Sequence, residues 1–211
     1  MAWTTPRTWI PGEFVTGSML NTHLRDNLLF LFAGMPATYP ATLANVLNTV
    51  TETDVLHFTV PANAWISGDL IRIEIMCLFK QNSGANRTAV FKVNAGAGAQ
   101  VQLKFAGGGA AGTGLFSNDS ATELKIVVPL YLRRVGADVW IHHWENPLIT
   151  AGDATIIGAN TFSAVQQQID GISTPTNFTS NFDVTLKVTL DNANANYYLK
   201  PQVAKVTHFK G

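Results

Sequence analysis

The spacing of hydrophobic positions along the chain changes near residue 40. Before that point, apolar residues recur at the i, i+4, i+7 spacing of one helical face, at Leu20, Leu24, Leu28, Leu31 and the adjacent Phe32. Thr16 is a candidate N-cap, and Gly34 and Pro36 together supply a stop signal. The pattern therefore predicts a helix over residues 17–33.

Beyond residue 40, apolar and polar residues alternate as they do in strands with one wet face. In residues 182–190 every even position is apolar and every odd position is polar. The alternation predicts strands at residues 55–60, 70–79, 88–93, 101–105, 123–132, 138–144, 154–158, 182–190 and 197–208. Turn-forming residues separate several of these runs.

Many short strands with almost no helix after residue 34 predict a mainly β protein built on an antiparallel β-sandwich. We expect a jelly-roll-like arrangement, which leaves room for long loops at one end. Residues 1–40 would form an N-terminal arm and helix for attachment or oligomerisation, and residues 41–211 the sandwich domain. Residues 163–180 are the least regular and would form a loop or an edge segment, while Pro129 implies an edge position or a bulge.

An extended arm precedes the predicted helix. Trp3 and Trp9 flank Pro6 and Pro11, so two large apolar side chains lie on a backbone poorly suited to a sheet interior. Their indoles must pack on another surface, in the same subunit or in a neighbouring chain. Aromatic anchors of this kind are favoured at the centres of interfaces.

Residue identities in this arm form a motif, Pro6-Arg7-Thr8-Trp9, Gly12-Glu13, Val15-Thr16 and Leu20-Asn21-x-His23-x-Arg25-Asp26-Asn27. It is similar to the N-terminal segment of virion structural proteins of tailed bacteriophages, which are described as tail-fibre-like, minor tail or head-decoration components. The resemblance covers roughly the first thirty of the 211 residues. It implies that the chain is part of a phage particle, located in the virion after synthesis in the host bacterial cytoplasm.

The arm and the helical stripe together form the expected attachment or oligomerisation interface, made of Trp3, Pro6, Arg7, Trp9, Glu13, Leu20, Leu24, Arg25, Asp26, Leu28, Leu31 and Phe32. Three helices could bury their apolar faces around a trimer axis, or each helix could cap its own sandwich. Arg25 and Asp26 point in different directions on a helix. The resemblance implies that both are kept for partners elsewhere, such as the Glu13 arm of an adjacent subunit. A solvated helix face is the alternative.

The composition narrows the range of partners. The formal net charge is +0, from 14 basic and 14 acidic residues, so there is no basic field to bind nucleic acid directly. Only 13% of residues are charged, about half the usual share, which suits a protein packed against copies of itself or a larger assembly. No stretch approaches the ~18 apolar residues of a membrane span. The single cysteine, Cys77, is expected to be buried and inert.

Candidate chemical motifs are weak. Residues 107–112 match GxGxxG, but no helix is expected to follow, so a flexible loop is predicted in place of a cofactor site. His142 and His143 point to opposite faces of a strand, so no metal site is expected unless three copies of one of them meet on a trimer axis. The carboxylates are isolated and no nucleophile elbow is present, so no catalytic residue is predicted.

The leading hypothesis is therefore a non-enzymatic, homotrimeric capsid decoration (cement) protein that binds the major capsid protein or another virion protein and stabilises the head. The alternative is a tail-fibre or tail-tip protein that recognises a host-surface glycan through residues 107–114, Trp140, Trp144 and residues 163–180. The two indoles share one strand face, which would be either core or platform. The size of the indole favours the core.

Overall fold

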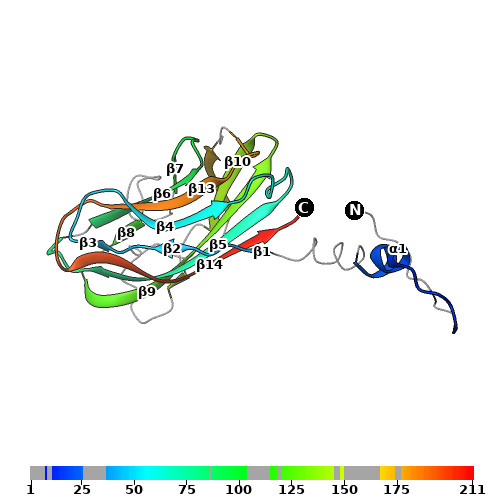
Figure 1. Cartoon of the computed structure of the whole chain (residues 1–211). Helices are drawn as coiled ribbons and strands as arrows, with labels where there is room; N and C mark the ends of the chain where they lie inside the picture. The colour runs from blue at the N-terminus through cyan, green and yellow to red at the C-terminus, as the bar shows by residue number, and fades with distance from the viewer. Residues whose placement is uncertain are drawn as a thin grey trace.

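The computed structural model describes residues 8, 11–25, 37–85, 87–103, 115–117, 120–144, 148–149, 167–173 and 177–211. Within these residues, two antiparallel sheets form a β-sandwich, and a short helical segment precedes it (Figure 1). This architecture confirms the predicted mainly β fold class.

Eight of the described strands form the larger sheet. In spatial order it contains β1 (Ala37–Thr38), β14 (Tyr197–Phe209), β5 (Leu70–Gln81), β9 (Ser120–Val135), β10 (Asp138–Trp144) and β12 (Gln167–Ser173), with β3 (Val46–Leu47) beside β14 and β11 (Leu148–Ile149) beside β9.

The smaller sheet has six of the described strands. Its order is β2 (Thr42–Leu43), β4 (Thr53–Val60), β13 (Phe182–Leu190), β6 (Arg87–Ala95) and β7 (Val101–Gln102), with β8 (Leu115–Ser117) also paired to β6.

The strand order is that of a jelly roll. The chain crosses between the sheets from β4 to β5 to β6 and again from β13 to β14, so the order β1-β14-β5-β9 in one sheet faces β4-β13-β6-β7 in the other. This interleaving confirms the jelly-roll-like prediction. The strands β10 and β12 extend the larger sheet beyond β9.

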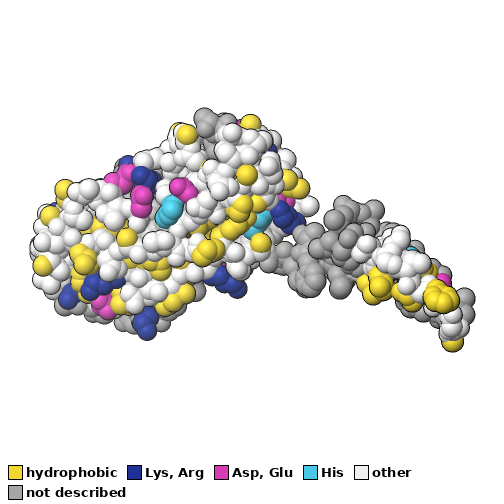
Figure 2. All heavy atoms as spheres, viewed as in Figure 1, with side chains coloured by type: hydrophobic (Ala, Val, Ile, Leu, Met, Phe, Trp, Pro, Cys, Tyr) yellow, Lys and Arg dark blue, Asp and Glu magenta, His cyan; other side chains and the backbone are white. Residues whose placement is uncertain are grey.

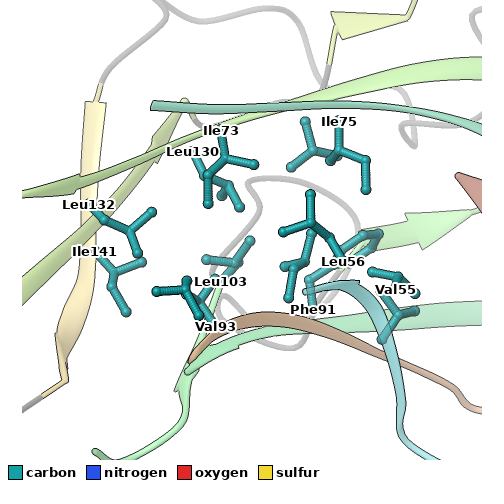
Figure 3. Close-up of a cluster of buried hydrophobic side chains, with 14 of the residues drawn as sticks. Val55, Leu56, Ile73, Ile75, Phe91, Val93, Leu103, Leu130, Leu132 and Ile141 are labelled. Carbon is teal, nitrogen blue, oxygen red and sulfur yellow. The ribbon is translucent and has the colours of Figure 1, made fainter. Parts of the chain in front are cut away.

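The core lies between the two sheets and follows from side-chain alternation. Along β5, Ile71, Ile73 and Ile75 are buried and the residues between them are not. Figure 3 shows side chains of β5, β9 and β10 meeting those of β4 and β6. Each side chain on an inner face is thereby removed from water, which is the main favourable contribution to folding.

A bulge in β4 interrupts the alternation of inward and outward side chains, because Val55 and Leu56 are consecutive and both buried. In the ladder with β13, Leu186 pairs with Leu56, but the next residue pairs with Asp54. Val55 is therefore an extra residue in β4, and the bulge allows two consecutive side chains to face the core.

Most predicted strands are present. The range of β13 matches the prediction, and β4, β5, β6, β9, β10 and β14 contain most or all of the predicted runs. The run at 101–105 begins with β7, its residues 104–105 lie outside the described residues, and so does the run at 154–158. The irregular stretch at 163–180 was expected to be a loop or an edge segment; its residues 167–173 form β12 at the edge of the larger sheet.

Pro129 was expected at a sheet edge or a bulge, and the structure places it at neither. It lies in β9, between β5 and β10 within the larger sheet and without a bulge in its pairing with Glu74. The pairing of β9 with β10 ends at Leu130, and the pairing with β11 begins at Val127. Pro129 thus occupies a gap between two partner strands on that side, where its missing N–H costs no ladder bond.

The helix begins where predicted. The Thr16 side chain accepts a hydrogen bond from Met19 N at 3.3 Å and caps α1 (Gly17–Leu20), which continues into the π-helical turn η1 (Asn21–Arg25). The rest of the predicted helix, residues 26–33, lies outside the described residues.

The inward and outward positions of β6 make a matched test of the sandwich. Phe91 is fully buried, whereas the adjacent Val90 points to the opposite face. Phe91→Ala is expected to lower the free energy of unfolding by about 3–5 kcal/mol, because it leaves a cavity in the core. Val90→Ala should change it by less than about 1 kcal/mol. Chemical denaturation of both variants measures the difference, and equal losses would contradict the assigned faces.

Candidate attachment site

The structure describes part of the predicted attachment interface. Glu13, Leu20 and Leu24 are described with their side chains, and Arg25 is described as the last residue of η1. The remaining predicted residues lie outside the described part of the chain, namely Trp3, Pro6, Arg7, Trp9, Asp26, Leu28, Leu31 and Phe32.

The described N-terminal segment, residues 11–25, exposes apolar side chains. Phe14 is 94% exposed, Leu20 is 42% exposed and Leu24 is 50% exposed, and α1 contains no buried residue. Figure 2 shows hydrophobic side chains on the surface of this segment. Leu20 and Leu24 are four residues apart, so they lie on one helical face as predicted. Such a face gains free energy when another apolar surface covers it.

A buried polar network lies at the end of the sandwich where β1 begins and β14 finishes. Asp69 and His208 are both essentially inaccessible to solvent. His208 Nε2 lies 2.8 Å from Asp69 Oδ2, and His208 Nδ1 lies 2.8 Å from the hydroxyl of Tyr39. These contacts join residues that are more than one hundred positions apart in the sequence.

Backbone groups complete the coordination of the Asp69 carboxylate. Ile66 N donates to Oδ2 at 3.0 Å, and Gly211 N donates to Oδ1 at 2.8 Å. Lys210 Nζ lies 3.5 Å from Oδ2. Gly211 packs against Gly68 so closely that an added Cβ would lie 2.6 Å from the Gly68 carbonyl carbon. The absence of a side chain at Gly211 thus allows its N–H to reach Asp69.

The pKa shifts in this network have one consistent assignment of protons. Burial raises the pKa of Asp69, but the hydrogen bonds from Gly211, Ile66 and His208 outweigh it and leave that pKa lowered. Burial lowers the pKa of His208, and burial with the charge of Asp69 raises the pKa of Tyr39. A neutral His208 therefore donates a hydrogen bond from Nε2–H to the Asp69 carboxylate. Its Nδ1 accepts a hydrogen bond from the Tyr39 hydroxyl.

Aromatic packing holds the neighbouring loop. Trp65 is buried, stacks on Phe182 with ring centroids 6.1 Å apart and contacts Phe178 edge to face. The guanidinium of Arg134 lies 3.7 Å from the centroid of the Phe178 ring and also donates to the Trp65 carbonyl. The loop from β4 to β5 is thereby fixed beside Asp69, so this end of the sandwich provides a rigid base next to β1.

Sequence reasoning missed this network. The sequence pattern assigns no role to His208, whose partner Asp69 is 139 residues away. The available signal was the alternation of residues 197–208, because it places His208 on the same face as buried Val206. A polar side chain at an inner strand position requires a partner, but the sequence alone does not identify which one.

Of the histidine and tryptophan residues singled out in β10, Trp140 and His142 are described with their side chains. Trp140 lies on the outer face of β10, half-buried, while its neighbours Val139 and Ile141 enter the core. The expectation that Trp140 is a core residue is therefore wrong. Its ring stacks against His142 with centroids 6.5 Å apart. Backbone positions alone are described for His143 and Trp144.

The remaining expectations concern metal ligands, a membrane span, the cysteine and the glycine loop. Among the residues that the structure describes, no group of three or more potential metal ligands converges, and no helix is long and apolar enough to cross a membrane. Cys77 is buried as predicted, and burial raises its pKa to about 12. The glycine loop at 107–112 lies outside the described residues.

Comparisons with known proteins identify no family. No family model matches the chain, and no curated protein matches it. A solved structure with some likeness is a mutant of Trypanosoma rangeli sialidase displaying trans-sialidase activity, at 9% identity and a TM-score of 0.17. The match covers 81% of this chain and 30% of the sialidase chain. A likeness of this size supports no conclusion about fold or function.

The buried network predicts a specific pH dependence of stability. Because the pKa of His208 is lower in the folded protein than the ordinary value of about 6.5, the unfolded chain takes up that proton first as pH falls. The free energy of unfolding should therefore fall below pH 6.5, by up to about 1.4 kcal/mol per pH unit. The lowered pKa of Asp69 adds a second loss below its ordinary range.

Urea denaturation between pH 7.5 and 5 measures the first loss. His208→Gln should flatten the dependence, since glutamine does not take up a proton. A slope that is unchanged in His208→Gln would contradict the assigned network.

Proposed function

We propose that this chain is a non-enzymatic structural protein of a tailed-phage virion, namely a homotrimeric capsid decoration (cement) protein that stabilises the head. The observation that carries the proposal is the segment over residues 14–24, in which Phe14, Leu20 and Leu24 are exposed. Apolar side chains in such a segment favour burial against another chain.

Two further observations support this proposal. The motif in the first thirty residues resembles the N-terminal segment of phage virion proteins, and the exposed helical segment lies within that motif. The Asp69 network joins the loop before β5 to the end of the chain around β14, and it lies immediately beside β1. A rigid body joined to an apolar attachment segment suits a protein that binds at junctions of a capsid lattice and adds buried area there.

A tail-fibre or tail-tip protein that binds host glycan is the second candidate. The outward position of Trp140 favours it, because sugar-binding surfaces use exposed aromatic rings beside polar side chains, and His142 lies against this indole. The two candidates share the fold, the proposed trimer and the N-terminal attachment. They differ in which particle component is bound.

The attachment segment can be tested by charge substitution. The double variant Leu20→Asp and Leu24→Asp is expected to weaken binding to expanded capsids by about tenfold or more, because burial of an unpaired carboxylate is unfavourable. Ser18→Asp adds a charge at another exposed position of α1 and is the matched control. Co-sedimentation with purified capsids measures both variants.

Three outcomes separate the candidates. Capsid binding by the wild type in multiples of three copies, lost in the double variant but kept in the control, supports the decoration role. Binding to host cells or to tails in place of capsids, located by electron microscopy of labelled particles, favours the tail candidate. Undiminished capsid binding by the double variant would show that attachment does not use this helical face.

A further inference from the structure

We infer that the outer face of the larger sheet is a docking surface for an acidic protein partner. The inference rests on the proposed function, since a decoration protein binds a protein surface, and it specifies the chemistry of that surface. It also places a contact on the sandwich in addition to the N-terminal segment. It begins from the outward residues of β14, β5 and β9, which alternate with those that form the core.

Basic side chains are concentrated on this face. Six of the 14 basic residues of the chain lie there, two on each of three neighbouring strands. They are Lys200 and Lys205 of β14, Arg72 and Lys80 of β5, and Lys125 and Arg133 of β9. Lys125, Lys205 and Arg133 are exposed, and the other three are partly exposed. Figure 2 shows basic side chains along the lower margin of the sandwich, where β14 and β9 lie in Figure 1.

Acidic side chains are fewer on the same face. Among the residues described with their side chains, they are Glu74, Glu123 and Asp138. Glu74 accepts a hydrogen bond from Arg72 at 2.6 Å, and Glu123 accepts one from the Tyr198 hydroxyl. Asp138 is the first residue of β10 and lies at the end of the face. Six basic side chains against three acidic ones leave an excess of positive charge, which the formal net charge of +0 for the whole chain conceals.

The outer face of the smaller sheet differs, because its two central lysines are paired within the chain. Lys92 forms an ion pair with Glu52 at 2.7 Å. Lys187 lies 3.3 Å from Asp54 and 3.5 Å from Glu52. These carboxylates compensate the lysine charges locally. Of the two outer faces, the face of the larger sheet is therefore the one with unbalanced positive charge.

The central position of the basic residues excludes a simpler explanation. Lysine on an edge strand discourages pairing between sheet edges, but β5 pairs with β14 on one side and with β9 on the other. Lys80 and Arg72 on β5 therefore protect no edge. Contact with water is satisfied by charges of either sign. An excess of one sign on a central strand and its two neighbours instead attracts a surface of the opposite sign.

The basic residues form two groups, each with one residue from each of the three strands. The first group is Lys80, Lys125 and Lys200, and the second is Arg72, Lys205 and Arg133. Lys80 and Arg72 are eight positions apart on β5, about 26 Å at ~3.3 Å per residue. This separation exceeds the screening length of ~10 Å at about 0.1 M salt. The two groups therefore act as separate points of attachment for carboxylates.

An apolar band between the two groups favours protein over nucleic acid. There Val203 pairs with Met76, which pairs with Val127, and Val203 is 57% exposed. A phosphate backbone has no apolar group to cover this band, and Glu74 beside the second group would repel a uniformly anionic polymer. A protein surface presents carboxylates and apolar side chains at separate positions. The partner that fits is an acidic protein surface with apolar residues between its carboxylates.

Binding of the full chain to labelled polymers, followed by fluorescence anisotropy, tests the inference. The probes are a glutamate–tyrosine copolymer, poly-L-glutamate and double-stranded DNA. We expect the copolymer to bind most tightly, because its carboxylates meet the basic groups and its tyrosines cover the apolar band. Binding should weaken between about 50 mM and about 300 mM NaCl, because salt screens exposed charges.

The test variant is Lys205→Gln with Arg133→Gln, which removes two positive charges from the face. The matched control is Val90→Glu with Thr189→Glu, which lowers the net charge by the same amount on the outer face of the smaller sheet. We expect the test variant to bind the copolymer about tenfold more weakly than the wild type, and the control to stay within about twofold of it.

Thermal unfolding reports whether both variants are folded, and Lys80→Gln with Lys200→Gln provides an independent test in the first group. Three results would overturn the inference. They are a wild type that does not bind the copolymer, test variants that bind it as tightly as the control, and tighter binding of DNA than of the copolymer. The last result would assign the face to nucleic acid.

Capsid binding separates this inference from the proposed function. If the wild type binds the copolymer through this face but does not bind expanded capsids, the docking surface stands and the decoration role fails. If the wild type binds capsids and the test variants bind them equally well, the decoration role stands and the inference fails.

Discussion

Burial of the inner face of β5 is the constraint on which the other parts of the structure depend. The strand lies between β14 and β9 and pairs with both along nearly its whole length. Its inward isoleucines contact the core that faces the smaller sheet (Figure 3). Because side chains alternate along a strand, the same register that buries Ile73 and Ile75 also fixes the outward positions of Arg72, Glu74 and Met76. Core and surface are therefore set together.

Long alternating runs were predictable because each carries several repeats of period two. The run at 182–190 matches β13 from end to end, since every inward residue is apolar. Two-residue strands such as β1, β2 and β3 have no period to detect, and they form because the neighbouring strands offer unpaired edges. Trp140 was misplaced because its size favoured burial, although the alternation in β10 already assigned Val139 and Ile141 to the core.

The N-terminal segment and the Asp69 network show a different limit of sequence reasoning. Local signals identified the start of α1, since the Thr16 cap and the spacing of Leu20 and Leu24 act within a few residues. The Asp69 network depends on the meeting of a loop, β14 and Tyr39, and the order in which the sheets pair brings these together. Only the fold defines such contacts. They place a charged group in the interior of the sandwich, beside β1.

The burial of Cys77 has a practical consequence. It is the one cysteine of the chain, and it lies in the core on the inner face of β5. A thiol in that position stays protonated and out of reach of reagents in the folded protein. An engineered surface cysteine would thus be the single site for a fluorophore or spin label, and distances between labelled copies could be measured without removing the native residue.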